Sequence, residues 1–258
     1  MSRKLFFFDY DGTLAIPRTR TIPQSTRDAL AALERNGHLV ALATGRLQCN
    51  ALSYIDSLGI RNIVADGGYS VTVDGKLLWM QPLDLASCKA CLHRLSDAGI
   101  LWAVQTANEM LRHTPFARFD EVAGDYYVPT QVDESLDIDT LTAVYKIYIP
   151  CKRQDQDAFI ATGILDGMPW VRYDSDTVFV EPMEKELGIK KMAELLGASL
   201  EDVVVYGDGK NDISMFCSCW TSIAMGNAIP QLKERADYVT SDVEHDGIYN
   251  ACNHFGWI

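Results

Sequence analysis

The chain has 258 residues, of which 48% are hydrophobic and 22% charged, so it can bury a substantial core in one large domain or two. Its net charge of −12 argues against nucleic acid or an anionic membrane as a partner, because both attract clusters of lysine and arginine. No stretch approaches the roughly 18 uninterrupted apolar residues of a membrane span, and the first apolar segment stops at Asp9, too early for a secretory signal. We therefore expect a cytoplasmic protein.

The N-terminal part alternates strands and helices, which predicts an α/β fold with a doubly wound, Rossmann-like parallel sheet. A two-residue Asp74-Gly75 turn then indicates a β-hairpin. In chain order we expect a strand at Leu5–Phe8, a helix at Gln24–Glu34, a strand at His38–Ala43, a helix at about Arg46–Leu58, a strand at Ile63–Ala65 and hairpin strands at Tyr69–Val73 and Lys76–Met80.

Near Pro82 the regular alternation stops, which indicates an α+β unit. The stretch Thr114–Asp139 supports no assignment of its own. Around it we expect a helix at Leu85–Ala98, strands at Ile100–Val104 and Val144–Ile149, a helix at Gln156–Leu165 and strands near Trp170–Arg172 and Val178–Glu181.

From Lys185 the α/β alternation resumes. An alternation that stops and then resumes implies a domain inserted into a core, so we expect a core of residues 1–82 and 182–258 around an α+β domain of residues 83–181. The resumed elements are a helix at Lys185–Leu196, a strand at Val203–Tyr206, a short helix at Asp212–Phe216, a strand at Ser222–Met225, a helix at Pro230–Arg235 and a strand at Tyr238–Val239.

The seven cysteines include two close pairs, Cys88-x-x-Cys91 and Cys217-x-Cys219. A structural zinc site needs a second pair of ligands at suitable spacing, and none is evident in the sequence. We therefore expect the reduced thiols that are usual in the cytosol.

Polar motifs follow three of the predicted core strands, at the sheet edge where α/β proteins bind ligands. Asp9-Tyr-Asp11-Gly-Thr13 follows the first strand, Thr44-Gly45-Arg46 the second, and Gly207-Asp208-Gly-Lys-Asn211-Asp212 follows Val203–Tyr206. Lys185 opens the helix that leads into that last strand, so it belongs at the same edge. Two acids beside a glycine suit a nucleophile, a proton donor and a hard cation, although the first motif alone is also compatible with a plain Asx-rich turn.

With these motifs in this order, the chain resembles the haloacid dehalogenase-like (HAD) hydrolases, and among them the Cof-type phosphatases. The resemblance spans nearly the whole chain, and it rests mainly on the Asp9–Thr13 motif and the loop 207–212. The family carries a large α+β cap between its second and third motifs, where the inserted domain falls here. The resemblance implies a Mg²⁺-dependent hydrolase of phosphate esters.

Three lysines compete for the family's phosphate-binding position. Lys185 begins its helix, whereas Lys190 lies roughly 7–8 Å further along it and away from the ligand edge. Lys185 also fits the family's usual Lys-x-x-Gly-Ile phrase, here followed by Gly188 and Ile189. We choose Lys185 and keep Lys190 as the alternative; for Lys191 a solvated helix face is the simpler interpretation.

The resemblance implies a catalytic role for each acid of the first motif. Asp9 would attack phosphorus and form an aspartyl-phosphate, and Asp11 would protonate the leaving oxygen and then activate water. Mg²⁺ would be held by the Asp9 carboxylate, the Asp11 main-chain carbonyl and Asp208, with water completing the shell.

The remaining motif residues would bind phosphate or support its ligands. Thr44, Gly45 and Lys185 would hold the phosphoryl oxygens together with Asn211. Asp212 would not contact the phosphate itself; it would orient the metal ligands or the lysine. Thr44 can also cap the helix that follows it, and both roles are compatible.

Several polar residues keep two interpretations. Arg46 is either a substrate-side group or a surface charge, and Asp66-Gly67-Gly68 departs from the family's usual Asn-Gly-Ala and is interpreted as a loop that faces the substrate. A polar stretch of the inserted domain could face the active site, although an exposed loop is the preferred interpretation for each member: Arg112, His113, Arg118, Asp120, Glu121, Asp125 and Tyr126.

The expected partner is a small phosphorylated metabolite such as a sugar phosphate, because a large cap excludes bulky polymers. The chain is expected to be a monomer or a weak homo-oligomer. A phosphotransferase or phosphomutase that uses the same aspartyl-phosphate remains an alternative, and so does a metabolite-binding protein that has kept only the fold.

Overall fold

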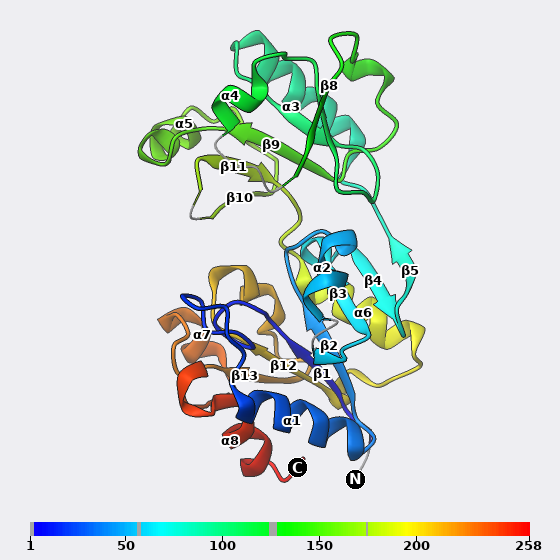
Figure 1. Ribbon diagram of the computed structural model, residues 1–258, viewed down its shortest axis with the longest axis vertical. Helices are drawn as coiled ribbons and strands as arrows, with labels where there is room; N and C mark the ends of the chain where they lie inside the picture. The colour runs from blue at the N-terminus through cyan, green and yellow to red at the C-terminus, as the bar shows by residue number, and fades with distance from the viewer. Residues whose placement is uncertain (1–2, 56–57, 124–127, 174) are drawn as a thin grey trace. The chain divides into compact units, whose positions relative to one another are not determined.

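The computed structural model describes residues 3–55, 58–123, 128–173 and 175–258, and the chain divides into two compact units. One unit comprises Met1–Met80 and Met183–Ile258, and the other Gln81–Pro182. Each unit is built around its own sheet (Figure 1). In the described residues, no helix has the length and apolar composition needed to span a bilayer.

The first unit contains a sheet of order β14-β13-β12-β1-β2-β3-β4-β5. Neighbouring strands from β14 to β3 run parallel, and the hairpin strands β4 and β5 pair antiparallel at one edge. The strands are β1 (Leu5–Phe8), β2 (Leu39–Ala43), β3 (Asn62–Ala65), β4 (Ser70–Val73), β5 (Lys76–Met80), β12 (Val203–Gly207), β13 (Thr221–Ala224) and β14 (Tyr238–Val239).

Strand β1 lies inside this sheet, between β2 and β12, and all four of its residues are buried. A continuous apolar run suits such a strand, because helices cover both faces of a parallel sheet. The α/β fold predicted from the alternation of strands and helices is thereby confirmed, with an antiparallel hairpin added at the edge.

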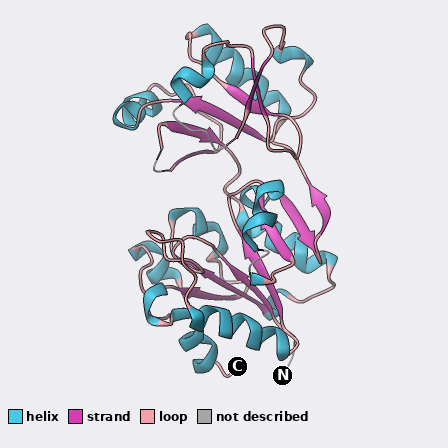
Figure 2. Ribbon diagram, in the orientation of Figure 1, coloured by secondary structure: helices cyan, strands magenta, loops and turns pink. Residues whose placement is uncertain are grey.

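The helices of this unit lie beside its sheet (Figure 2). Helices α1 and α8 contact each other, and α2 and α6 pack against β3. In α1 the buried residues Thr26, Ala29, Leu30 and Leu33 follow the helical period. The helices are α1 (Gln24–Arg35), α2 (Gln48–Ile55), α6 (Lys185–Leu195), α7 (Pro230–Arg235) and α8 (Gly247–His254).

Some predicted helices differ from the structure. The short helix expected at Asp212–Phe216 is a 3-10 helix, η6 (Lys210–Met215), and α8 was not predicted. The helix expected from Arg46 begins at Gln48, and part of its predicted end lies outside the described residues. Helix α8 follows Asp246 at its N-cap position, but the Asp246 side chain makes no capping hydrogen bond, and the first helical residue is a glycine, which has a low helix propensity.

The second unit contains a sheet of order β10-β11-β9-β6-β7-β8, in which β7 and β8 are parallel and the other pairs antiparallel. An α+β unit was expected here. The strands are β6 (Ala103–Gln105), β7 (Arg112–Thr114), β8 (Thr130–Val132), β9 (Lys146–Pro150), β10 (Trp170–Arg172) and β11 (Thr177–Val180), and the helices are α3 (Leu85–Asp97), α4 (Phe119–Ala123) and α5 (Gln156–Ala161).

The unassigned stretch Thr114–Asp139 holds α4 and β8, and Arg112, one of the polar residues expected in an exposed loop, lies in β7 instead. Its side chain is 1% exposed and lies over the rings of Phe119 and Tyr148, with its Nε donating to Thr130. The apolar stem and flat guanidinium of arginine allow such stacking, which polarity alone does not reveal. Asp125 and Tyr126 lie outside the described residues.

The expectation of reduced thiols is wrong for one cysteine pair. Cys217 and Cys219 form a disulfide, with their Cα atoms 5.6 Å apart, within the range that a disulfide spans. Cys88 and Cys91 carry no disulfide and are buried on α3, as expected for core residues.

Candidate active site

The centre of the candidate site is Lys185, which the chain's fold brings against two distant carboxylates. Its Nζ donates to Asp9 Oδ1 and to Asp212 Oδ1, each at 2.6 Å. Asp9 directly follows β1, Lys185 is the first residue of α6, and Asp212 lies in η6. All three side chains are almost fully buried, at 7%, 1% and 0% exposed.

Asp212 also organises the loop after β12. Its Oδ2 accepts hydrogen bonds from the main-chain amides of Asp208 and Gly209, both at 2.9 Å. One carboxylate therefore fixes the lysine with one oxygen and the loop backbone with the other. This leaves the Asp208 side chain oriented by other contacts.

Asp208 lies beside the first motif. Thr13 Oγ1 donates to Asp208 Oδ1 at 3.0 Å, and Gly12 comes so close that a Cβ there would stand 2.2 Å from Asp208 Oδ2. Gly12 also has a φ of +89°, which L side chains rarely adopt. Glycine is therefore required twice over, by the turn and by the approach of the carboxylate.

The electrostatics of this cluster are dominated by three carboxylates gathered around one ammonium group. Burial, followed by repulsion from Asp212, raises the pKa of Asp9 to about 7, although Lys185 opposes the shift. Burial and repulsion from Asp9 and Asp212 raise the pKa of Asp208 to about 8. Burial acts to lower the pKa of Lys185, but the attraction of Asp212 and Asp9 outweighs it and the pKa is raised. The cluster lacks positive charge.

A divalent cation would supply that charge, and the donor set fits one. Single carboxylate oxygens of Asp9, Asp208 and Asp212 lie within 4.8 Å of one another. The two oxygens of Asp212 already accept from Lys185 and the loop amides, so Asp9 and Asp208 are the carboxylates best placed to bind an ion. Oxygen-only ligands suit a hard cation such as Mg²⁺.

Asp11 lies at the mouth of the cluster rather than inside it. Its side chain is 49% exposed, and its Oδ2 accepts a hydrogen bond from Arg46 Nη2 at 2.7 Å. The Arg46 guanidinium also lies 5.5 Å from the centre of the Tyr10 ring. Of the two interpretations of Arg46, the described contacts favour a group of the site, because it reaches the second acid.

The other predicted phosphate-binding residues follow β2 and β12, the two strands that flank β1 in the sheet. Thr44 is 3% exposed, and its hydroxyl accepts from the Arg46 amide at 3.2 Å, which makes it the local cap of that turn. Gly45 is half-buried beside it. Asn211 is also half-buried, and its Oδ1 lies 2.6 Å from where a Cβ on Gly209 would stand.

The loop Asp66–Gly68 supports Lys185, a role that the sequence did not suggest. Glu184 donates its amide to the Gly67 carbonyl at 2.7 Å, and a Cβ on Gly68, whose φ is +110°, would stand 2.0 Å from the Glu184 carbonyl oxygen. Asp66 is buried and accepts from Ser70. The described contacts thus direct this loop to the start of α6.

Two further supporting residues were given no role in the sequence analysis. Thr13 was part of the quoted motif, and its bond to Asp208 follows from its place in the same turn. Asn227 donates to the Gly12 carbonyl at 2.8 Å and accepts from the Val243 amide. It lies shortly after β13, so the strand-end rule could have identified it.

Lys190 does not reach the cluster. It lies on the exposed side of α6 and pairs with Glu186 four residues earlier. Such pairs on a helix surface contribute little to stability, and among the described residues Lys190 contacts Glu186 and not the cluster.

Comparison with known proteins places this geometry in a family context. The family model for haloacid dehalogenase-like hydrolases matches residues 6–252. YkrA of Bacillus subtilis (strain 168), which carries a provisional phosphatase name, is 32% identical over 257 residues that cover 99% of each chain. YwtE of the same organism, named a 5-amino-6-(5-phospho-D-ribitylamino)uracil phosphatase, is 24% identical over 275 residues that cover 95% of each chain.

Solved structures agree with these matches. A hypothetical protein of Geobacillus kaustophilus HTA426 is 29% identical, with a TM-score of 0.81 and complete coverage of both chains. The sugar phosphatase BT4131, of HAD subclass IIB, is 26% identical with a TM-score of 0.76, covering 99% of this chain and 100% of that one.

Proposed function

The chain belongs to the haloacid dehalogenase-like hydrolase family, and from this premise we propose that it is a Mg²⁺-dependent phosphatase that hydrolyses small phosphorylated metabolites through a phosphorylated Asp9. The observation that carries the proposal is the Lys185 bridge between Asp9 and Asp212, with Asp208 alongside. A buried lysine between two carboxylates orients a nucleophile and offers charge to an incoming phosphoryl group.

In the first step, an Asp9 oxygen attacks phosphorus while the bond from phosphorus to the ester oxygen breaks. Asp11 gives its proton to the departing oxygen, which leaves as an alcohol. The position of Asp11 supports this role, because its carboxyl is half-exposed at the mouth of the cluster. The result is an aspartyl-phosphate on Asp9 and an ionised Asp11.

In the second step, Asp11 takes a proton from water as that water attacks the same phosphorus. The bond from phosphorus to Asp9 breaks, and inorganic phosphate leaves. Both acids return to their starting protonation states. Lys185 keeps its hold on Asp9 through both steps, and Asp212 keeps Lys185 in place.

Asp9, Asp208 and the Asp11 main-chain carbonyl would hold the Mg²⁺. When bound, the ion supplies positive charge to the cluster of three carboxylates and stabilises charge on the transferred phosphoryl group. The raised pKa values of Asp9 and Asp208 support the need for this charge.

Thr44, Gly45 and Asn211 would contact the remaining phosphoryl oxygens. We place the natural substrate among small phosphorylated metabolites, with sugar phosphates first, because BT4131 is named a sugar phosphatase. The expectations of a cytoplasmic location and of a monomer or weak homo-oligomer belong to this proposal.

The direct test measures phosphate release from a panel of sugar phosphates, nucleotides and pyridoxal phosphate with Mg²⁺. Asp9→Asn is expected to lower kcat by roughly a thousandfold or more, because the amide cannot act as the nucleophile. Lys190→Gln is the matched control, since it changes a surface lysine of the same helix and is expected to leave kcat unchanged.

Two outcomes would overturn parts of the proposal. Wild-type kcat in Asp9→Asn would exclude the aspartyl-phosphate, and activity that survives exhaustive chelation would exclude the Mg²⁺ requirement. Transfer of phosphate to an added sugar, in place of its release, would identify a phosphotransferase that uses the same intermediate.

A further inference from the structure

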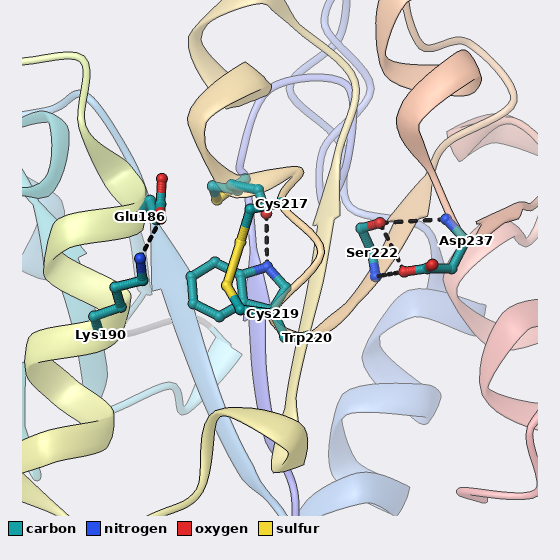
Figure 3. The surroundings of a disulfide bond; sticks show 8 residues. Glu186, Lys190, Cys217, Cys219, Trp220, Ser222 and Asp237 are labelled. Atoms are coloured by element: carbon teal, nitrogen blue, oxygen red, sulfur yellow. Dashed lines mark hydrogen bonds and ion pairs between the residues drawn. A yellow bond between two sulfur atoms is a disulfide. The ribbon is translucent and has the colours of Figure 1, made fainter.

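A second cluster of ligand-type side chains lies outside the proposed active site. Cys217 and Cys219 stand in the turn between η6 and β13, and Glu186 lies in the first turn of α6 (Figure 3). One ligand atom from each of these three residues lies within 4.8 Å of the others. All three residues are half-buried, so a metal ion could reach them from the solvent.

This cluster differs in chemistry from the carboxylate cluster around Lys185. It offers two sulfur atoms and one carboxylate, whereas the other offers only carboxylates. Thiolate ligands select thiophilic ions such as Zn²⁺, while oxygen ligands select Mg²⁺. The two clusters would therefore prefer different ions.

In the structure the two sulfur atoms are joined as a disulfide, which has no thiolate to offer. An external thiol such as glutathione can open it by exchange: two R–SH are oxidised to R–S–S–R, and the protein disulfide is reduced to two Cys–SH. Binding of a divalent ion then displaces the two thiol protons.

We propose that Cys217, Cys219 and Glu186 form a thiolate metal site for a thiophilic divalent cation such as Zn²⁺, available when the Cys217–Cys219 disulfide is reduced. Two sulfurs, one carboxylate oxygen and one water complete the tetrahedral set that Zn²⁺ prefers. The site is separate from the phosphatase chemistry and does not depend on it.

Lys190 competes with the metal ion for the Glu186 carboxylate. It pairs with Glu186 in the structure, so an incoming metal must displace its ammonium group from the carboxylate (Figure 3). An exposed ion pair of this kind is weak, so the displacement costs little. Removing the lysine charge is expected to tighten metal binding.

A bound metal would brace two elements that support the active site. Glu186 is adjacent to Lys185, and η6, which contains Asp212, ends two residues before Cys217. The metal would tie the first turn of α6 to the segment after η6. Because a ligand that binds only the folded state stabilises it by mass action, the reduced protein is expected to melt at a higher temperature with Zn²⁺.

The test titrates Co²⁺, a spectroscopic substitute for Zn²⁺, into the reduced full-length protein with excess Mg²⁺ to occupy carboxylate sites. Wild type is expected to show a sulfur-to-cobalt charge-transfer band at one equivalent, which Zn²⁺ abolishes. The oxidised protein and the Cys217→Ser/Cys219→Ser variant are expected to show none. Cys151→Ser, which removes a half-buried thiol of the other unit, is the matched control and keeps the band.

The affinity of the site for Zn²⁺ is measured by competition with a chromophoric chelator. Glu186→Gln is expected to weaken binding by at least about tenfold, since even loss of a supporting contact around a metal ligand costs about that much. Lys190→Met is expected to tighten it. Absence of the charge-transfer band in reduced wild type would overturn the proposal, as would its persistence in the double cysteine variant.

Discussion

The two units each bury a lysine, and they neutralise it in opposite ways. In the first, Lys185 meets two carboxylates, with a third close by. In the second, Lys146 pairs with Glu181 alone, while its Nζ lies 4.7 Å from the centre of the Phe179 ring. Around Lys185 negative charge is in excess, whereas around Lys146 the charges balance.

This difference distinguishes a binding site from a structural ion pair. The Lys185 cluster has unbalanced negative charge that a bound cation would neutralise, whereas the charges of Lys146 and Glu181 neutralise each other. Asp9 and Asp208 have raised pKa values, and perturbed pKa values of this kind are typical of functional sites. Further contacts stabilise both members of the Lys146–Glu181 pair. The Tyr173 hydroxyl donates a hydrogen bond to Glu181, and the Lys146 ammonium group lies near aromatic rings, which attract a cation. We therefore assign chemistry to the first lysine and structural support to the second.

The largest expected effect is on catalysis. Lys185→Met is expected to lower kcat by about 100- to 1,000-fold, because one preorganised charge facing the phosphoryl group is lost. Lys146→Met, measured per folded molecule, is expected to keep kcat within a small factor. The check is phosphate release under saturating substrate and Mg²⁺; equal losses in both variants would break the distinction between the two lysines.

The second effect is on stability and has the opposite pattern. Lys146→Met leaves Glu181 buried without its ion-pair partner, so we expect the free energy of unfolding to fall by about 3 to 5 kcal/mol. Urea unfolding followed by circular dichroism measures this. The double variant Lys146→Met/Glu181→Leu is expected to recover most of the loss, and a double variant as unstable as the single one would contradict the explanation.

The third effect is a pH dependence of the metal-free protein. The pKa values of Asp9 and Asp208 in the fold, about 7 and about 8, exceed their ordinary value of 3.8. Between about pH 4 and pH 8 the folded state thus holds more protons than the unfolded state, so its stability falls as pH rises.

Thermal midpoints at several pH values, in chelator and in Mg²⁺, test this expectation. Mg²⁺ is expected to reduce the decline, because it neutralises the ionised carboxylates, and Asp208→Asn is expected to make the metal-free decline shallower. Identical slopes in Asp208→Asn and wild type would show that the decline arises elsewhere in the chain.

The fold was largely predictable because the core strands are continuous apolar runs with polar residues at their carboxyl ends. The buried run Leu5–Phe8 and the helix start at Lys185 carried enough signal to place both at one sheet edge. Helix α8 was not predicted because it has only eight residues and begins with a glycine. Arg112 was interpreted as exposed because the sequence alone does not show that its guanidinium stacks on the rings of Phe119 and Tyr148.

The hydrogen bonds between residues of the site were less predictable than the positions of those residues in the fold. The bond from Arg46 to Asp11 depends on side-chain reach between two loops, and the bond from Asn227 to Gly12 joins residues far apart in the chain. The Cys217–Cys219 disulfide was missed because spacing alone does not distinguish a bridge from two free thiols.

The site is sensitive to substitution not only at its acidic residues but also at Gly12. Every other amino acid carries a Cβ, and here that atom would stand 2.2 Å from the Asp208 carboxylate. Any missense mutation in this codon therefore displaces Asp208 or distorts the turn, even when the new residue is alanine. In a saturation-mutagenesis screen scored for activity, Gly12 should be as intolerant as Asp9 and Asp11, the two acids that precede it in the chain.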